Sequence, residues 1–190
     1  MCRSPGGRQN WALPFLTLIA PSARWSETHA GRHRKLTDWA RQAILETKRW
    51  LPARDLIFVA DSGFAAIDLI GAVCRHVCLI TRLRLDGNIF RPAPKRQPRQ
   101  RGRPQLKGRQ LPKLTAVLAN AKTNWTTTMV SQWYNARQRT LLTATGTAVW
   151  YHSGLPLVPI RWVLVRDPSG EHDPQAFLST DLDLAGARLR

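Results

Sequence analysis

Asp61 is the first residue whose position suggests chemistry, because it directly follows the β-branched and aromatic run "DLIFVA" (55–60) and precedes a small-residue segment. Such a run predicts a strand, and ligand sites in α/β sheets lie at the carboxyl ends of strands. A carboxylate there can bind a divalent metal ion. An aspartate just before a helix can equally serve as its N-cap. Phosphodiester cleavage by two metal ions requires several converging carboxylates, so Asp61 alone leaves both interpretations open.

A second candidate site is the basic stretch "RQRGRPQLKGR" (99–109). Within it, Arg101-Gly102-Arg103-Pro104 places two guanidinium groups on a slim backbone, which suits a narrow A·T-rich minor groove and is similar to an AT-hook core. A disordered basic linker that contacts any phosphate is the alternative, and four residues do not decide between them. In both cases the predicted DNA-binding residues are Arg96, Arg99, Arg101, Arg103, Lys107 and Arg109.

Cysteine and aromatic side chains are weaker candidates. Cys74 and Cys78 flank His76, but no second Cys or His pair stands at zinc spacing, so two buried thiols are the favoured interpretation. The aromatic residues of the second half could stack on unpaired bases, although so many large rings in a small sheet more often form its core. These residues are Trp125, Trp133, Tyr134, Trp150, Tyr151 and Trp162.

The elements that must position Asp61 form a βαβ unit. The run 55–60 predicts a strand, "FAAIDLIGAVCR" (64–75) has helical spacing, and "HVCLITRL" (76–83) predicts a second strand, parallel to the first. Upstream, 11–20 is a continuous apolar run that predicts a strand covered on both faces. Between them, an amphipathic helix is expected from Thr37, as its N-cap, to Pro52.

The composition changes sharply between Gly87 and Leu114, where nine basic residues and five prolines occur with no acidic residue. A segment of this kind buries little apolar surface and is expected to be an extended, mobile arm. After it, three runs rich in Thr, Val and Trp predict antiparallel strands. They are "NWTTTMV" (124–130), "QRTLLTATGTAVW" (138–150) and "IRWVLVRD" (160–167).

The overall charge points to a nucleic-acid partner. The 190 residues include 29 Lys and Arg against 12 Asp and Glu, a net charge of +17 that favours polyanions over acidic small molecules. No run approaches the ~20 apolar residues of a membrane helix, so we expect a soluble protein without a membrane partner. The three cysteines are too few for a disulfide framework and suit a reducing compartment.

Several of these stretches resemble one protein family, above all "FVADSGFAAIDLI", "ITRLRLDGNIF", the "QRGRP" arm and "GTAVWYHSGLPLVPIRWVLVRDPSG" followed by "FLSTDLDL". They are similar to the DDE-superfamily transposases of bacterial insertion sequences, in the cut-and-paste branch, from about Trp11 to Asp183. The resemblance implies a ribonuclease-H-like α/β fold interrupted by a strand-rich insertion. It also implies Asp61 as the second catalytic Asp and an Mg²⁺ ligand, with double-stranded transposon ends as substrate.

The chain departs from the family pattern at both ends. The family's first Asp should lie upstream of the 11–20 run, and its Glu should lie on a Tyr-x2-Arg-x3-Glu-x6-Lys helix beyond "STDLD"; Asp181 and Asp183 belong to the preceding strand. The resemblance therefore implies a central fragment with one of three catalytic carboxylates, inactive alone. It also implies a sheet with an uncovered edge. Such a fragment could self-associate or associate with an intact transposase in the bacterial cytoplasm, near the nucleoid.

The expected organisation is an incomplete ribonuclease-H-like domain with a mixed sheet, flanking helices and a mainly antiparallel β insertion. Residues 1–86 would be the partial core, 87–114 the basic arm, 115–183 the insertion and return to the core, and 184–190 a truncated tail. Two other hypotheses stay open. One is a non-enzymatic DNA-binding protein acting through residues 91–113; the other is a complete small nuclease with a different acidic set.

Overall fold

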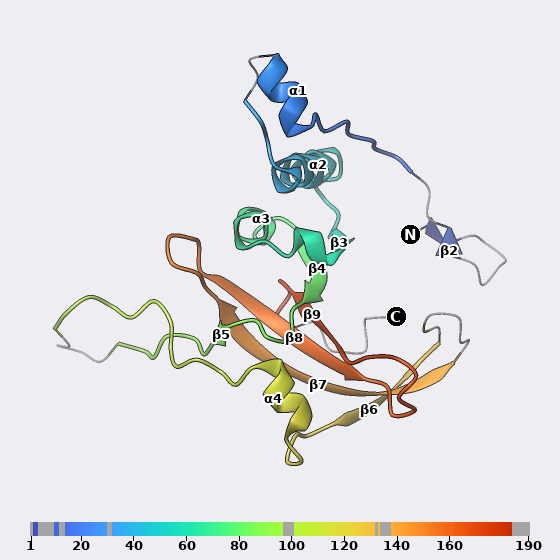
Figure 1. Cartoon of the computed structure of the whole chain (residues 1–190), viewed down its shortest axis with the longest axis vertical. Helices are drawn as coiled ribbons and strands as arrows, with labels where there is room; N and C mark the ends of the chain where they lie inside the picture. The colour runs from blue at the N-terminus through green and yellow to red at the C-terminus, as the bar shows by residue number, and fades with distance from the viewer. Residues whose placement is uncertain are drawn as a thin grey trace.

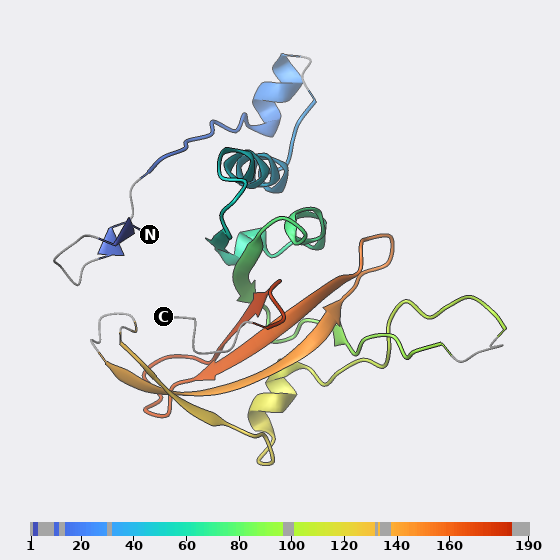
Figure 2. The same cartoon turned by 180° about the vertical axis from the view of Figure 1, so that it is seen from behind.

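The protein is a mixed α/β molecule in which helices stack on a long, twisted sheet (Figures 1 and 2). This computed structural model describes residues 2–3, 10–11, 14–29, 32–96, 101–131, 133 and 138–183. The helices are α1 (Ala23–Thr28), α2 (Leu36–Trp50), the 3₁₀ turn η1 (Ser62–Phe64), α3 (Ile67–Val73) and α4 (Leu114–Ala119). The strands are β1 (Cys2–Arg3), β2 (Asn10–Trp11), β3 (Ile57–Ala60), β4 (Cys78–Leu83), β5 (Ile89–Phe90), β6 (Thr126–Val130), β7 (Arg139–Trp150), β8 (Val158–Arg166) and β9 (Gln175–Ser179).

Seven strands form one mixed sheet in the order β3-β4-β9-β8-β7-β5, with β6 paired to β7. β3 and β4 are parallel and are connected through α3, as expected for a βαβ unit, whereas the other pairs are antiparallel. The predicted fold class is confirmed: the mixed sheet with flanking helices is consistent with a ribonuclease-H-like nuclease. The strand-rich region continues this sheet, since β9 pairs directly with β4.

The helices pack on one face of the sheet. α2, α3 and α4 contribute to a single core cluster, which also takes alternate residues of the strands, such as Leu79 of β4 and Leu164 of β8. The opposite face has a smaller cluster of Leu141, Val163 and Val165, which contains no residue of a described helix. The two faces therefore differ: α2, α3 and α4 cover one, whereas no described helix covers the other, which we call the open face.

One edge of the sheet, at β3, is unpaired on its outer side among the described residues. Within the described part of the chain, β3 pairs with β4 alone. Ile57 and Val59 are 54% and 78% exposed, which is unusual for β-branched residues in a sheet. Both lie on the same face as Asp61, because side chains alternate along a strand.

The helix prediction for residues 37–51 is confirmed, with a different N-cap. α2 starts at Leu36, and its N-cap is Lys35, whose backbone N–H donates to Oδ2 of Asp38 over 3.1 Å. Thr37 is therefore inside the first turn. The carboxylate of Asp38 at this position also complements the positive end of the helix dipole.

The strand predicted for residues 11–20 is wrong. Residues 14–20 have no regular secondary structure, and Phe15 and Ile19 are 70% and 88% exposed. β2 in this region contains two residues, which pair with β1. Pro14 has no N–H to donate to a ladder, and residues 15–20 pair with no strand of the described sheet; residues 12 and 13 lie outside the described residues. Hydrophobicity alone therefore overestimated the order of this segment.

The segment 87–114 is more ordered than its composition suggested. Ile89 is 1% exposed and pairs with Trp150, and Leu114 at the other end is also 1% exposed. Backbone bonds join the two ends: the N–H of Leu111 donates to Ile89 O over 2.9 Å. The expectation of an unstructured arm is thus wrong at both ends, because a few apolar residues anchor them in the core.

A close approach between β7 and β8 explains the glycine at position 146. Gly146 stands opposite Trp162 in the antiparallel register. A β carbon at this position would lie 2.8 Å from Cζ2 of that indole. The glycine therefore lets Trp162 lie across the strand pair and pack against the main core.

Candidate functional site

Asp61 lies at the carboxyl end of β3, where its backbone is held from the neighbouring strand. Ala60 is the partner of Thr81 in the parallel register. The hydroxyl of Thr81, a residue only 1% exposed, donates to the backbone carbonyl of Asp61 over 2.8 Å. A buried hydroxyl needs such a partner, so this bond fixes the point at which β3 ends.

The side chain of Asp61 caps the 3₁₀ turn η1. Its Oδ1 accepts a hydrogen bond from the backbone N–H of Ser62 over 2.6 Å, and it lies 3.3 Å from the hydroxyl of Ser62. The side chain itself is exposed. The capping role predicted from the sequence is therefore present, while Oδ2 has no hydrogen-bond partner among the described residues and could bind another group.

The described residues around Asp61 do not fit a two-metal centre. In the described part of the chain, the side chains that form a group of three or more able to share a metal ion are Asp167, Glu171 and His172, and Asp61 is not among them. Asp181 lines a different cleft, beside Asp55 at the amino ends of β3 and β4. One carboxylate cannot hold two divalent ions, which need several oxygen ligands each.

The cluster around Asp167 is held by an arginine. Arg139 NH1 lies 3.6 Å from Oδ2 of Asp167, whose side chain is 2% exposed, and Arg139 also forms an ion pair with Glu171. Oδ1 of Asp167 accepts from the backbone N–H and the hydroxyl of Ser169, over 3.0 and 2.8 Å. The guanidinium pairs with both carboxylates, so the cluster fastens the β8–β9 turn to the start of β7. This cluster was not singled out in the sequence analysis.

The cysteines are engaged in sulfur contacts. Cys74 and Cys78 are half-buried rather than fully buried as expected. The thiol of Cys74 lies 3.7 Å from Gly71 O, and that of Cys78 lies 3.5 Å from the hydroxyl of Ser179. The two thiols thus pack at opposite ends of the turn between α3 and β4.

The basic segment forms a loop with a clamped base, which we call the basic loop (residues 91–109). At its base, the N–H of Arg91 donates to Arg109 O over 2.9 Å, and the N–H of Gly108 donates to Arg91 O over 2.8 Å. The ammonium of Lys107 lies 3.4 Å from the ring centroid of Phe90 and 4.6 Å from that of Tyr151. These cation–π contacts add to the backbone pairing.

The outer part of the basic loop projects from β5 away from the sheet (Figures 1 and 2). Arg96, Arg101 and Arg103 are exposed there, and Arg109 is exposed at the base of the loop. NH2 of Arg96 donates to Gly102 O over 3.3 Å, and Gly102 has a φ of 99°, which a glycine adopts without strain. Arg99 lies outside the described residues. The structure therefore brings five of the six predicted DNA-binding residues into one loop, with Lys107 at its base.

The aromatic residues of the second half belong to the core, as the sequence favoured. Trp125, Trp150 and Trp162 pack against the main cluster, and Trp133 packs against the smaller one. Tyr151 is at the base of the basic loop, and Tyr134 lies outside the described residues. These rings therefore stabilise the sheet.

Residues 7–147 match the family model of the DDE superfamily endonucleases. The chain belongs to this family. The match includes Asp61, the βαβ unit and the basic loop, and it ends within β7. The family acts on DNA and generally uses a divalent metal. No curated protein matches the chain. Among the described residues, no helix is long and apolar enough to cross a membrane.

The Asp167 cluster yields a prediction about pH. Burial alone would raise the pKa of Asp167, but the hydrogen bonds from Ser169 and the positive charges of Arg139 and His172 outweigh it, so the pKa lies below its ordinary value of 3.8. The stability from such a group is present above the ordinary pKa and is lost as the pH falls through the folded-state value. We expect Asp167→Asn to lower the urea midpoint at pH 7, and this difference from wild type should shrink below about pH 4.

Urea unfolding followed by circular dichroism at several pH values would measure this effect. Asp173→Asn is the matched control, because Asp173 lies two residues before β9 in the same connection from β8, is exposed, and has no side-chain partner among the described contacts. A midpoint difference for Asp167→Asn that stays constant from pH 7 to acid would contradict the assignment.

Proposed function

We propose that this chain is part of a DDE transposase of the bacterial insertion-sequence type and does not cleave DNA by itself. The family reaction would be Mg²⁺-dependent cleavage and strand transfer at transposon ends. The supporting observation is the position of Asp61, at the end of a strand in a mixed sheet, where a metal ligand is expected. Among the described residues, Asp61 belongs to no group of three or more side chains that could hold a metal ion together, which supports the inactivity.

The role proposed for Asp61 is that of one ligand in a larger site. Its exposed carboxylate is bonded through Oδ1 to Ser62, which leaves Oδ2 available to a cation. The remaining carboxylates would have to come from outside the residues described here. The open edge at β3, with the exposed Ile57 and Val59, would allow another strand to lie beside Asp61. A second copy of the chain or an intact transposase is the partner proposed for this edge.

The lone carboxylate yields a prediction about catalysis. Removal of ligands from a metal site abolishes chemistry that depends on it. Purified protein incubated with end-containing duplex DNA and Mg²⁺ is therefore expected to give no nicked, cut or joined product on a denaturing gel. Asp61→Asn should give the same background as wild type. Metal-dependent cleavage that is lost in Asp61→Asn would contradict the proposal.

A second candidate function is DNA binding without catalysis, through residues 91–113. It is favoured by the clamped base of the basic loop, because a fixed base reduces the conformational entropy lost when the loop binds. The exposed Arg101 and Arg103 at its outer part would contact phosphates or enter an A·T-rich minor groove. The protein would then occupy transposon ends near the bacterial nucleoid.

The DNA-binding hypothesis predicts that removal of the charges of Arg101 and Arg103 lowers the affinity for DNA. The double substitution Arg101→Gln with Arg103→Gln is expected to weaken binding to an A·T-rich duplex and to reduce the slope of log K against log [salt] by about two, one for each phosphate contact. Fluorescence anisotropy at several salt concentrations measures both quantities. The matched control is Arg54→Gln with Arg75→Gln, which removes the same charge from exposed residues far from the loop in sequence. Equal losses in both double variants would contradict a role for the loop.

A further inference from the structure

Arg82 stands beside Asp61 at the end of the β3–β4 pair. Ala60 and Thr81 are partners in the parallel register, so the next residues, Asp61 and Arg82, are neighbours across the two strands. Neighbours in register project from the same face of a sheet. For these two residues it is the open face, since Thr81 is buried under the helices and side chains alternate.

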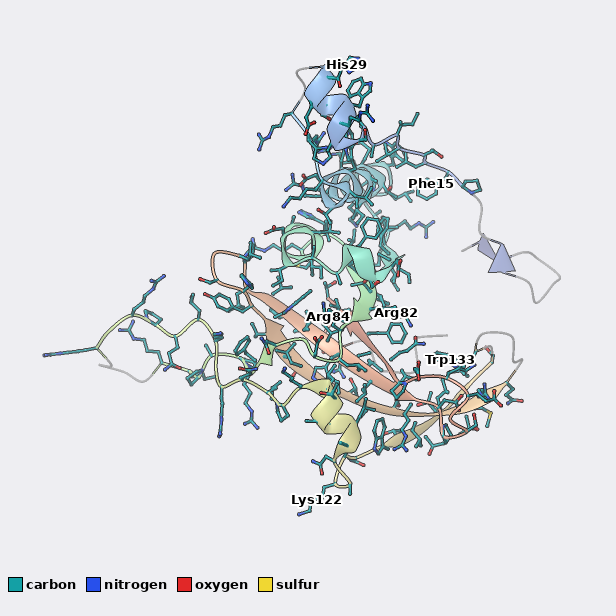
Figure 3. All side chains as sticks on the ribbon, viewed as in Figure 1. Phe15, His29, Arg82, Arg84, Lys122 and Trp133 are labelled. Carbon is teal, nitrogen blue, oxygen red and sulfur yellow. The ribbon has the colours of Figure 1, made fainter. Side chains whose placement is uncertain are left out.

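Arg82 carries a charge that the described part of the protein does not neutralise. Its side chain is exposed, and none of the ion pairs or hydrogen bonds found among the described residues involves its guanidinium. Arg84, two residues further along, differs: its Nε and NH2 donate to the two carboxylate oxygens of Asp86 over 2.9 and 2.8 Å. Figure 3 labels both arginines where β4 reaches the centre of the molecule.

A cleft of about 320 Å³ opens beyond the carboxyl end of β4. Ser62, the residue after Asp61, lines one part of it, and Arg82 and Arg84 line another. Trp150 and Ala176 add apolar surface. The volume is at the lower end of the range of ligand pockets, about 300–1,000 Å³. Asp61 does not line this cleft, and Trp150 and Ala176 belong to the helix-covered core. The cleft therefore marks the strand ends beside Arg82, whereas the strand register places Arg82 beside Asp61.

We propose that Arg82 binds a DNA backbone phosphate beside Asp61. A guanidinium donates two parallel hydrogen bonds to phosphate oxygens, whereas an unmetallated carboxylate such as Asp61 repels the same group. Arg82 is then a positioning residue that holds the phosphodiester next to the carboxylate. Arg84, which Asp86 already holds, is not required for this contact. The inference rests on the proposal that the chain binds DNA.

The test is a double-mutant cycle in DNA binding, which needs no catalytic activity. Arg82→Gln is expected to weaken binding of the full chain to a fluorescent duplex on the order of five-fold at low salt and to reduce the salt slope by about one. Arg82→Lys should retain the slope with a smaller loss of affinity, because it keeps the charge but not the two-pronged geometry. Arg75→Gln, at the opposite end of β4, is the charge-matched control and should change affinity by less than about two-fold.

The substitution Asp61→Asn tests whether the phosphate bound by Arg82 lies next to Asp61. It is expected to strengthen DNA binding in the wild-type background, because it removes repulsion of the nearby phosphate, and to do so less in the Arg82→Gln background. Two results would overturn the inference. One is an equal loss of DNA affinity in Arg82→Gln and Arg75→Gln. The other is an effect of Asp61→Asn on DNA affinity that is the same in the wild-type and Arg82→Gln backgrounds. If Arg101→Gln with Arg103→Gln still weakens binding to duplex DNA in that case, the proposed DNA-binding function is supported and the phosphate site at Arg82 is rejected. A wild-type chain that does not bind duplex DNA would overturn both.

Discussion

The parallel pairing of β3 with β4 is the constraint on which the functional account depends. The register places Ala60 opposite Thr81, and the bond from the buried Thr81 hydroxyl to Asp61 O ends β3 at that point. A shift of one residue would turn Asp61 and Arg82 toward the helix-covered face. The chemistry proposed at the sheet edge is therefore a consequence of strand register, which the packing of Leu79 and Leu83 under the helices fixes in turn.

The charge balance of the chain explains why arginines that form no ion pair in the described part of the protein lie on the open face and on the basic loop. With a net charge of +17, the chain cannot neutralise its own cations, and the few acidic residues are used for local structure. Asp86 holds Arg84, and Asp167 with Glu171 holds Arg139. Arg82 and Arg101 form no ion pair among the described residues and are exposed, and a polyanion is the ligand that would compensate their charges.

Local patterns predicted much of the fold and part of the site. The βαβ unit followed from the alternation of the runs 55–60, 64–75 and 76–83, and the antiparallel strands followed from their Thr- and Val-rich composition. The strand prediction failed for residues 14–20 because burial depends on a partner surface, which the hydrophobicity of the segment itself cannot reveal. The pairing of Asp61 with Arg82, and of Arg139 with Asp167, arises from register and long-range contacts, which no local pattern contains.

The most direct test of the central claim is Mn²⁺ binding to the isolated chain, followed by electron paramagnetic resonance of the free ion. A single exposed carboxylate should bind Mn²⁺ weakly, with a Kd on the order of 10⁻³ M or above, and Asp61→Asn should change the titration little. Tight, stoichiometric uptake of Mn²⁺ by wild type that disappears in Asp61→Asn would show that Asp61 already belongs to a complete metal site, and it would contradict this account.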